Sequence, residues 1–173
     1  MNTRLARTIG RSAAALSVAA AALIPAGVAV ADTPAPAGAP APSACRPANQ
    51  QATVTQSDSS AGHRHYAVTI TAGPGTAPCT LKGSPTHVGF SLNGSPRAIN
   101  TVAYGNQDQT AVLAPGHPVT FDVQVQNTPG GATANEVHFT PVEPDGQVPG
   151  DFVAHGPLTV DGTPQIGPVT AAG

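Results

Sequence analysis

Charged and aromatic residues are scarce in this chain of 173 residues. Lys, Arg, Asp and Glu make up 9% of it, aromatic residues 3%, and Trp is absent. Seven basic and nine acidic residues give a net charge of −2. Proteins that bind nucleic acids carry a basic patch or stripe, so this balance argues against a nucleic-acid partner.

Residues that favour helices are also rare after position 31. That part of the chain contains two Glu, one Lys and no Met, whereas Val is its commonest large apolar residue with 14 copies. Val is stiff at χ1 and suits a pleated surface, while Leu, Met, Glu and Lys favour helices. No stretch beyond the first 31 residues shows a helical period, so the composition indicates either an all-β protein or disorder.

The first 31 residues have the organisation of a secretory signal peptide. Three arginines precede an uncharged Ala/Leu-rich stretch at 13–24, and Ala29-Val30-Ala31 forms an A-x-A cleavage site. The apolar stretch of about 12 residues is short of the roughly 20 that cross a bilayer. We therefore expect a secreted or extracellular protein, possible association with the cell wall, and no stable membrane span after cleavage.

The predicted mature chain begins with a Pro/Ala-rich spacer at 32–44, and a single domain follows at 45–173. The spacer is typical of an extended, polyproline-like linker, which is either a functional stalk or an inert connection. Removal of the signal leaves four basic and all nine acidic residues, so the mature net charge is −5. The mature chain is therefore distinctly acidic.

Apolar and polar residues alternate strictly in several runs, which indicates strands instead of disorder. The alternation is clearest at 119–126 and recurs at 65–71, 87–92 and 137–139. Gly/Pro and Asn/Asp-Gly turn signals separate these runs, and Asn93-Gly94 is typical of a two-residue type I′ hairpin. The pattern predicts an all-β, immunoglobulin-like antiparallel β-sandwich of seven to nine short strands.

The two cysteines predict one disulfide, Cys45–Cys79, as expected in a secreted chain. Closing this loop stabilises the folded state by on the order of 3.8 kcal/mol in the chain-entropy model. No C-x-x-C motif is present, which favours a structural bond over a redox role.

Several segments resemble the actinobacterial exported family called domain of unknown function 4232. The most informative is Cys79-Thr80-Leu81-Lys82-Gly83-Ser84-Pro85, and weaker matches are Gly62-His63, Val112-Leu113-Ala114-Pro115-Gly116 and Pro157-Leu158-Thr159-Val160. The resemblance covers about residues 45–160 and implies an exported β-sandwich. It supplies no activity and no catalytic residues.

Six histidines are the most suggestive chemical feature of the mature chain. His63 and His65 are two residues apart on a predicted strand and so project from one face; they are the candidate metal ligands. His87 and His138 also alternate against apolar neighbours, and all four are expected to face outward. Imidazoles of this kind bind Zn²⁺ or Cu²⁺, but no spacing matches a compact ligand set, so scattered surface histidines are the simpler interpretation.

Catalytic motifs are missing from the sequence. It contains no G-x-S-x-G, H-E-x-x-H or S-x-x-K, so we expect no enzyme, no catalytic residues and no cofactor. The Glu143-Pro144-Asp145 segment is interpreted as a solvated loop rather than a calcium site. A hydrolase would require His63, His117 or His138 to meet a Ser and an Asp from distant strands.

Two functional hypotheses follow, with a hydrolase as a more remote third. The first is a monomeric, non-catalytic exported module that binds an unidentified extracellular or cell-wall ligand through its loops. The second is a metal-binding extracellular protein that uses its histidines.

Overall fold

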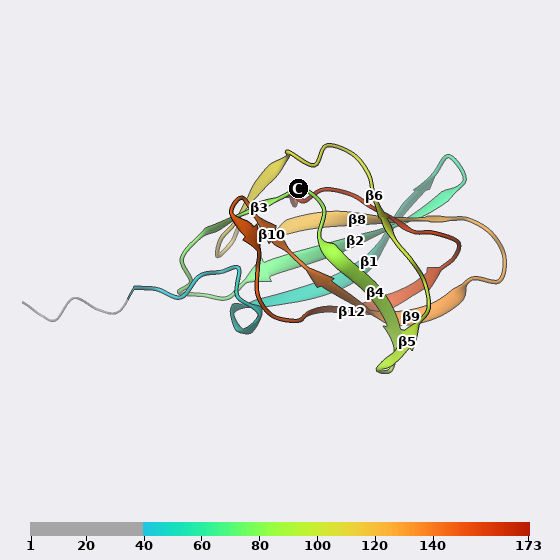
Figure 1. Ribbon diagram of the computed structural model, residues 1–173, viewed down its shortest axis with the longest axis horizontal. Coiled ribbons are helices and arrows are strands. Elements are labelled where there is room, and N and C mark those ends of the chain that lie inside the picture. Colours follow the sequence, from blue (N-terminus) through green and yellow to red (C-terminus); the bar gives the residue numbers. More distant parts are fainter. Residues whose placement is uncertain (1–39) are drawn as a thin grey trace, which may run out of the picture. The chain divides into compact units, whose positions relative to one another are not determined.

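The computed structural model describes residues 40–173, which form a nearly all-β fold (Figure 1). Within this range the sole helical element is the 3-10 turn η1 (Pro47–Asn49), so the all-β prediction is confirmed. No helix in residues 40–173 is long and apolar enough to cross a membrane. The predicted signal peptide, 1–31, and residues 32–39 of the predicted spacer lie outside the described residues.

Fourteen strands follow one another in residues 40–173, and several of them contain only two or three residues. They are β1 (Gln50–Ser60), β2 (His63–Ala72), β3 (Cys79–Lys82), β4 (Thr86–Leu92), β5 (Ser95–Arg97), β6 (Val102–Ala103), β7 (Thr110–Leu113), β8 (Val119–Gln126), β9 (Ala132–Thr140), β10 (Val142–Glu143), β11 (Gly146–Gln147), β12 (Phe152–Val160), β13 (Gln165–Ile166) and β14 (Thr170–Ala171).

One sheet contains ten of these strands. Its order is β5-β4-β9-β12-β1-β2-β8-β13-β6, and β14 pairs with the other end of β8. Most neighbours are antiparallel, but β1 runs parallel to β12 and β13 runs parallel to β6. Two small sheets, β3–β7 and β10–β11, complete the described fold.

The predicted immunoglobulin-like antiparallel sandwich of seven to nine strands is not confirmed. The main sheet is a curled half-barrel instead of one of two facing sheets (Figure 1). A twisted sheet of about ten strands must curl or split, and β-bulges increase local twist. Register shifts occur at Ser57/Ser60, His155/Leu158 and Thr86/Gly89, where they bend β1, β12 and β4.

Period-2 alternation places one face of each long strand in the core. In β8 every second residue from Val119 to Val125 is at most 1% exposed, and Tyr66, Val68 and Ile70 of β2 are at most 3% exposed. The β3–β7 sheet adds Leu81 and Leu113 to the same core. Phe121 packs edge-on against Phe139, with 5.1 Å between the ring centroids.

The disulfide predicted from the sequence is confirmed. Cys45 and Cys79 are bonded, and their Cα atoms are 5.9 Å apart. The bond ties the start of the domain to β3. The chain just before Cys45 is held as well, because Ala77 N donates to Pro42 O at 2.9 Å and Ala44 is fully buried. Residues 42–44 of the predicted spacer are thus part of the folded domain.

The predicted type I′ turn is also confirmed. Leu92 pairs with Ser95, and Asn93 and Gly94 have positive φ values of 48° and 77°. Both central residues of a type I′ turn need positive φ.

Candidate functional site

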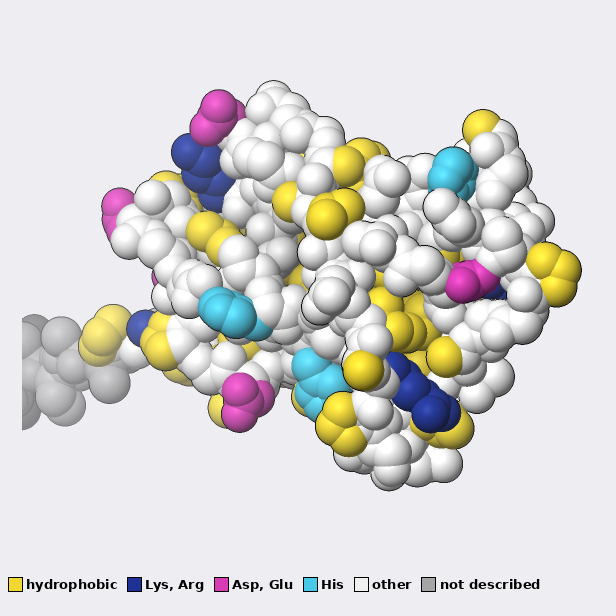
Figure 2. Space-filling model, turned by 45° about the vertical axis from the view of Figure 1, so that its right-hand side comes forward, with side chains coloured by type: hydrophobic (Ala, Val, Ile, Leu, Met, Phe, Trp, Pro, Cys, Tyr) yellow, Lys and Arg dark blue, Asp and Glu magenta, His cyan; other side chains and the backbone are white. Residues whose placement is uncertain are grey.

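The outer face of the main sheet is polar, in contrast to its apolar inner face. A single cross-strand row runs over seven strands from β4 to β14. Its members, in sheet order, are Ser91, Glu136, His155, Thr53, Thr69, Thr120 and Thr170. Figure 2 shows few charged side chains on the face that it displays, and an acidic side chain touches a basic one at its upper left.

Asp122 of β8 is the centre of the first polar cluster. Its Oδ2 lies 2.7 Å from His65 Nδ1 and accepts a 2.6 Å hydrogen bond from the Tyr104 hydroxyl. The His65 and Asp122 side chains are 19% and 29% exposed. Tyr104 comes from the segment after β6, so this carboxylate connects a crossing segment to β2 and β8.

Burial and the neighbouring carboxylate both affect Tyr104. Its pKa is raised well above the ordinary value, first by partial burial, then by the hydrogen bond to Asp122 and by the negative charge of that residue. Tyr104 therefore stays a neutral donor across the physiological range.

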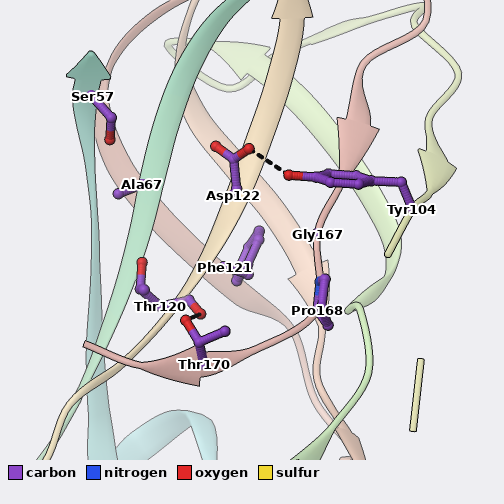
Figure 3. Close-up of a pocket in the computed structure, with 9 residues that line it drawn as sticks. All are labelled: Ser57, Ala67, Tyr104, Thr120, Phe121, Asp122, Gly167, Pro168 and Thr170. Atoms are coloured by element: carbon purple, nitrogen blue, oxygen red, sulfur yellow. Dashed lines mark hydrogen bonds between the residues drawn. The ribbon is translucent and has the colours of Figure 1, made fainter. Parts of the chain in front are cut away.

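A cavity of about 240 Å³ adjoins Asp122 (Figure 3). Ser57, Thr120 and Thr170 contribute hydroxyls to its lining, and Tyr104 and Pro168 contribute rings. Thr120 and Thr170 donate their hydroxyl protons to the carbonyls of Val68 and Thr120, which leaves their oxygens as acceptors. The cavity is thus rich in hydrogen-bond acceptors.

Asp122 adds a further free acceptor. Both of its side-chain donors bond Oδ2, and no hydrogen bond from residues 40–173 reaches Oδ1. In Figure 3 this second oxygen is turned away from Tyr104, towards the side on which Ala67 and Ser57 lie. A ligand that carries hydroxyl or ammonium donors matches this arrangement.

His65 also reaches a serine. Its Nε2 lies 3.0 Å from Ser60 Oγ, opposite the nitrogen that faces Asp122. This carboxylate–imidazole–hydroxyl order is that of a serine hydrolase. Ser60, however, is an exposed residue at the β1–β2 turn and does not line the cavity beside Asp122. Catalytic serines act in water-excluded sites beside oxyanion donors, so the cluster is better suited to positioning Asp122 than to acyl transfer.

A second polar cluster lies on β4 and β9. Glu136 Oε2 accepts hydrogen bonds from the Ser91 hydroxyl and from Gly94 N, the latter at 3.0 Å. His138 Nε2 lies 2.8 Å from Ser91 Oγ and 3.8 Å from Glu136 Oε2. The hydrogen bond from Ser91 contributes most to lowering the Glu136 pKa below its ordinary value, followed by the one from Gly94. His138 thus meets a serine and a carboxylate, but the carboxylate bonds the hydroxyl instead of the far ring nitrogen.

The candidate metal ligands His63 and His65 are already hydrogen-bonded. Both ring nitrogens of His65 have partners, and His63 Nδ1 lies 3.1 Å from Ala61 O. His117 lies elsewhere, in a bridge with Ala114. In the described part of the chain, one group of three potential ligands lies within 4.8 Å: Cys45, Cys79 and Glu143. Its two sulfurs form the disulfide and are not available as thiolates.

The Cys79–Pro85 segment has a structural role in this fold. Cys79 is disulfide-bonded, Leu81 is 1% exposed, and the Ser84 hydroxyl donates to Ile166 O at 2.8 Å. Gly83 has a φ of 64°, and a Cβ atom there would be 2.7 Å from Gln107 O.

The family described as "Domain of unknown function (DUF4232)" matches residues 45–170, which include this segment. The chain belongs to the DUF4232 family. No curated protein and no solved structure matches it.

Membership of DUF4232 brings no activity with it, so the clusters must be judged by their geometry. The sequence pattern indicated His65 as a metal ligand and included His155 only as one of six histidines. It did not indicate Asp122, Tyr104 or Glu136. Of these residues, only Asp122 stands out in the local sequence of this DUF4232 domain. It is the one charged residue in the alternating strand β8. Its partners come from other strands, and no sequence spacing links them.

Proposed function

We propose that this DUF4232 protein is exported and binds a ligand rich in hydrogen-bond donors, such as an envelope polysaccharide, in the cavity beside Asp122. The proposal rests mainly on the free Oδ1 of Asp122 and the acceptor oxygens around it. Binding, not catalysis, is the proposed role, because the hydroxyl aligned with His65 lies outside the cavity.

Two sequence features support export. The first 31 residues have the pattern of a secretory signal, and a disulfide such as Cys45–Cys79 persists in oxidising compartments. An exported protein meets cell-wall and polysaccharide ligands outside the cell.

The test measures how much purified mature protein is retained by insoluble cell-wall material and by soluble envelope polysaccharides. The wild-type protein should be enriched in one of these fractions, and Asp122→Asn should lose the enrichment because the carboxylate charge is gone. Asp145→Asn, in the exposed β10–β11 turn, is the matched control and should behave like the wild type.

Circular dichroism and thermal unfolding should show that Asp122→Asn is folded. A wild-type protein that is enriched in no fraction would contradict the proposed ligand class. Equal retention of Asp122→Asn and wild type would contradict the proposed site.

A further inference from the structure

Three potential metal ligands occupy adjacent positions on two neighbouring strands. Glu136 and His138 are two residues apart on β9 and share its outer face. His155 of β12 lies directly opposite Glu136 in the antiparallel register. Side chains directly opposite one another have Cβ atoms about 4.5–5.5 Å apart, and diagonal neighbours are still within reach of long side chains. Two imidazoles and one carboxylate therefore share one small area of the sheet.

The carboxylate of this group is already oriented. Ser91 Oγ and Gly94 N both donate to Glu136 Oε2, and these bonds hold it on the side of His138, whose Nε2 is 3.8 Å away. Hydrogen bonds of this kind to a ligand group are the usual outer-shell support of metal sites. They also favour the ionised carboxylate, which is the form that binds a cation.

Both imidazoles are exposed, and His138 exchanges its contact with Ser91 Oγ for the ion. The His138 side chain is 46% exposed, and His155 is exposed as well. The ligand atoms of the three residues do not all lie within 4.8 Å of one another, so binding requires His155 to rotate about its side-chain torsions, which an exposed residue does at small cost. Gly89 lies opposite His138 on β4, and a Cβ atom there would meet nothing within 4 Å. There is consequently room for an ion and its water ligands.

We propose that Glu136, His138 and His155 bind one Zn²⁺ or Cu²⁺ ion, with water in the remaining coordination positions. Imidazole nitrogen and carboxylate oxygen are ordinary ligands of both ions. This site uses other residues than the His63/His65 pair indicated by the sequence. Ser60 and Asp122 engage both ring nitrogens of His65, and His63 Nδ1 lies 3.1 Å from Ala61 O. The proposed metal site is also separate from the cavity beside Asp122 and does not depend on the function proposed for it.

The test is calorimetric titration of the untagged mature protein with Zn²⁺ alone, in a buffer that does not coordinate metal. One ion should bind per chain. Substitution of an outer-shell partner weakens a metal site by about 10–100-fold. His138→Gln and His155→Gln each remove a direct ligand, so each should weaken Zn²⁺ binding by at least about tenfold. His63→Gln and His117→Gln are matched controls and should leave the affinity unchanged.

Backbone NMR spectra recorded during the same titration locate the ion independently of the variants. Zn²⁺ should shift the amides of β9 and β12 around Glu136 and His155. The proposal is overturned if no saturable one-to-one binding is found. It is equally overturned if His63→Gln weakens binding more than His138→Gln, or if the shifts centre on β2.

Discussion

The Tyr104 hydroxyl donates a 2.6 Å hydrogen bond to the carboxylate of Asp122. This contact joins the segment between β6 and β7 to β8, at the edge of the proposed ligand cavity. Because the same carboxylate oxygen also contacts His65, Asp122 connects three separate parts of the chain.

Tyr104 should make the stability of the domain fall at high pH. The folded-state pKa of Tyr104 is raised, so above about pH 10 the unfolded chain loses the phenolic proton while the folded chain keeps it. The stabilisation is therefore fully present below about pH 10 and is lost as the pH rises towards the folded-state pKa. Urea unfolding between about pH 9 and 11 should show a smaller fall for Tyr104→Phe than for the wild type. Identical slopes would contradict the prediction.

Gly156 should not tolerate a side chain. A Cβ atom there would lie 2.1 Å from Val54 O of β1, at the point where the register of β12 with β9 shifts. Relief of such a clash requires backbone movement, so Gly156→Ala should lower the free energy of unfolding by about 2 kcal/mol or more. Chemical unfolding measures this loss. Gly89→Ala is the control, since its Cβ meets nothing within 4 Å, and it should change stability by less than about 0.5 kcal/mol. Equal effects of the two substitutions would disprove the assigned contact.

The disulfide should provide a large share of the stability. Replacing both Cys45 and Cys79 by Ala removes a cross-link over a sequence separation of 34 residues, which corresponds to about 4 kcal/mol in the chain-entropy model. The double variant should unfold at a much lower urea concentration than the oxidised wild type, and the reduced wild type should behave like the variant. A loss below about 1 kcal/mol would show that β3 is held mainly by other contacts.

Ser91 should control the ionisation of Glu136. The Ser91 hydroxyl is the first cause of the lowered Glu136 pKa, so Ser91→Ala should raise this pKa towards that of an ordinary glutamate. A lowered carboxyl pKa stabilises the fold above the unfolded-state pKa, and this is lost as the pH falls through the folded-state value. NMR titration of the glutamate carboxyl carbons measures the change, and Glu143, in the separate β10–β11 sheet, reports any general effect. An unchanged Glu136 pKa would rule out the hydrogen bond as its cause.

The features that sequence patterns predicted correctly are short-range. Alternation at 119–126 and 65–71 identified β8 and β2 together with their buried faces, and Asn93-Gly94 identified a turn with two positive φ values. The sequence around Val54 alternates only weakly, yet β1 has 11 residues. Most of its side chains are exposed, so hydrophobic alternation, the signal that reveals a half-buried strand, is missing there.

The arrangement of strands and the candidate sites could not be predicted in this way. The parallel pairing of β1 with β12 joins residues about 100 positions apart, and no local rule selects that partner. The same holds for Asp122 with Tyr104 and His65, and for Glu136 with His155. The His63/His65 spacing correctly placed two imidazoles on one strand, but it carried no information about the hydrogen bonds that engage them.

By itself, the sequence determined that this is an all-β, disulfide-bonded DUF4232 chain, because composition, alternation, cysteine count and the Cys79–Pro85 segment are read from neighbouring residues. Tertiary structure alone decided that the strands form a curled ten-stranded sheet instead of a sandwich. It also decided which polar residues meet on the outer face of that sheet. The physical reason is that strand pairing and register are long-range choices, and each pairing fixes which side chains from distant segments come into contact.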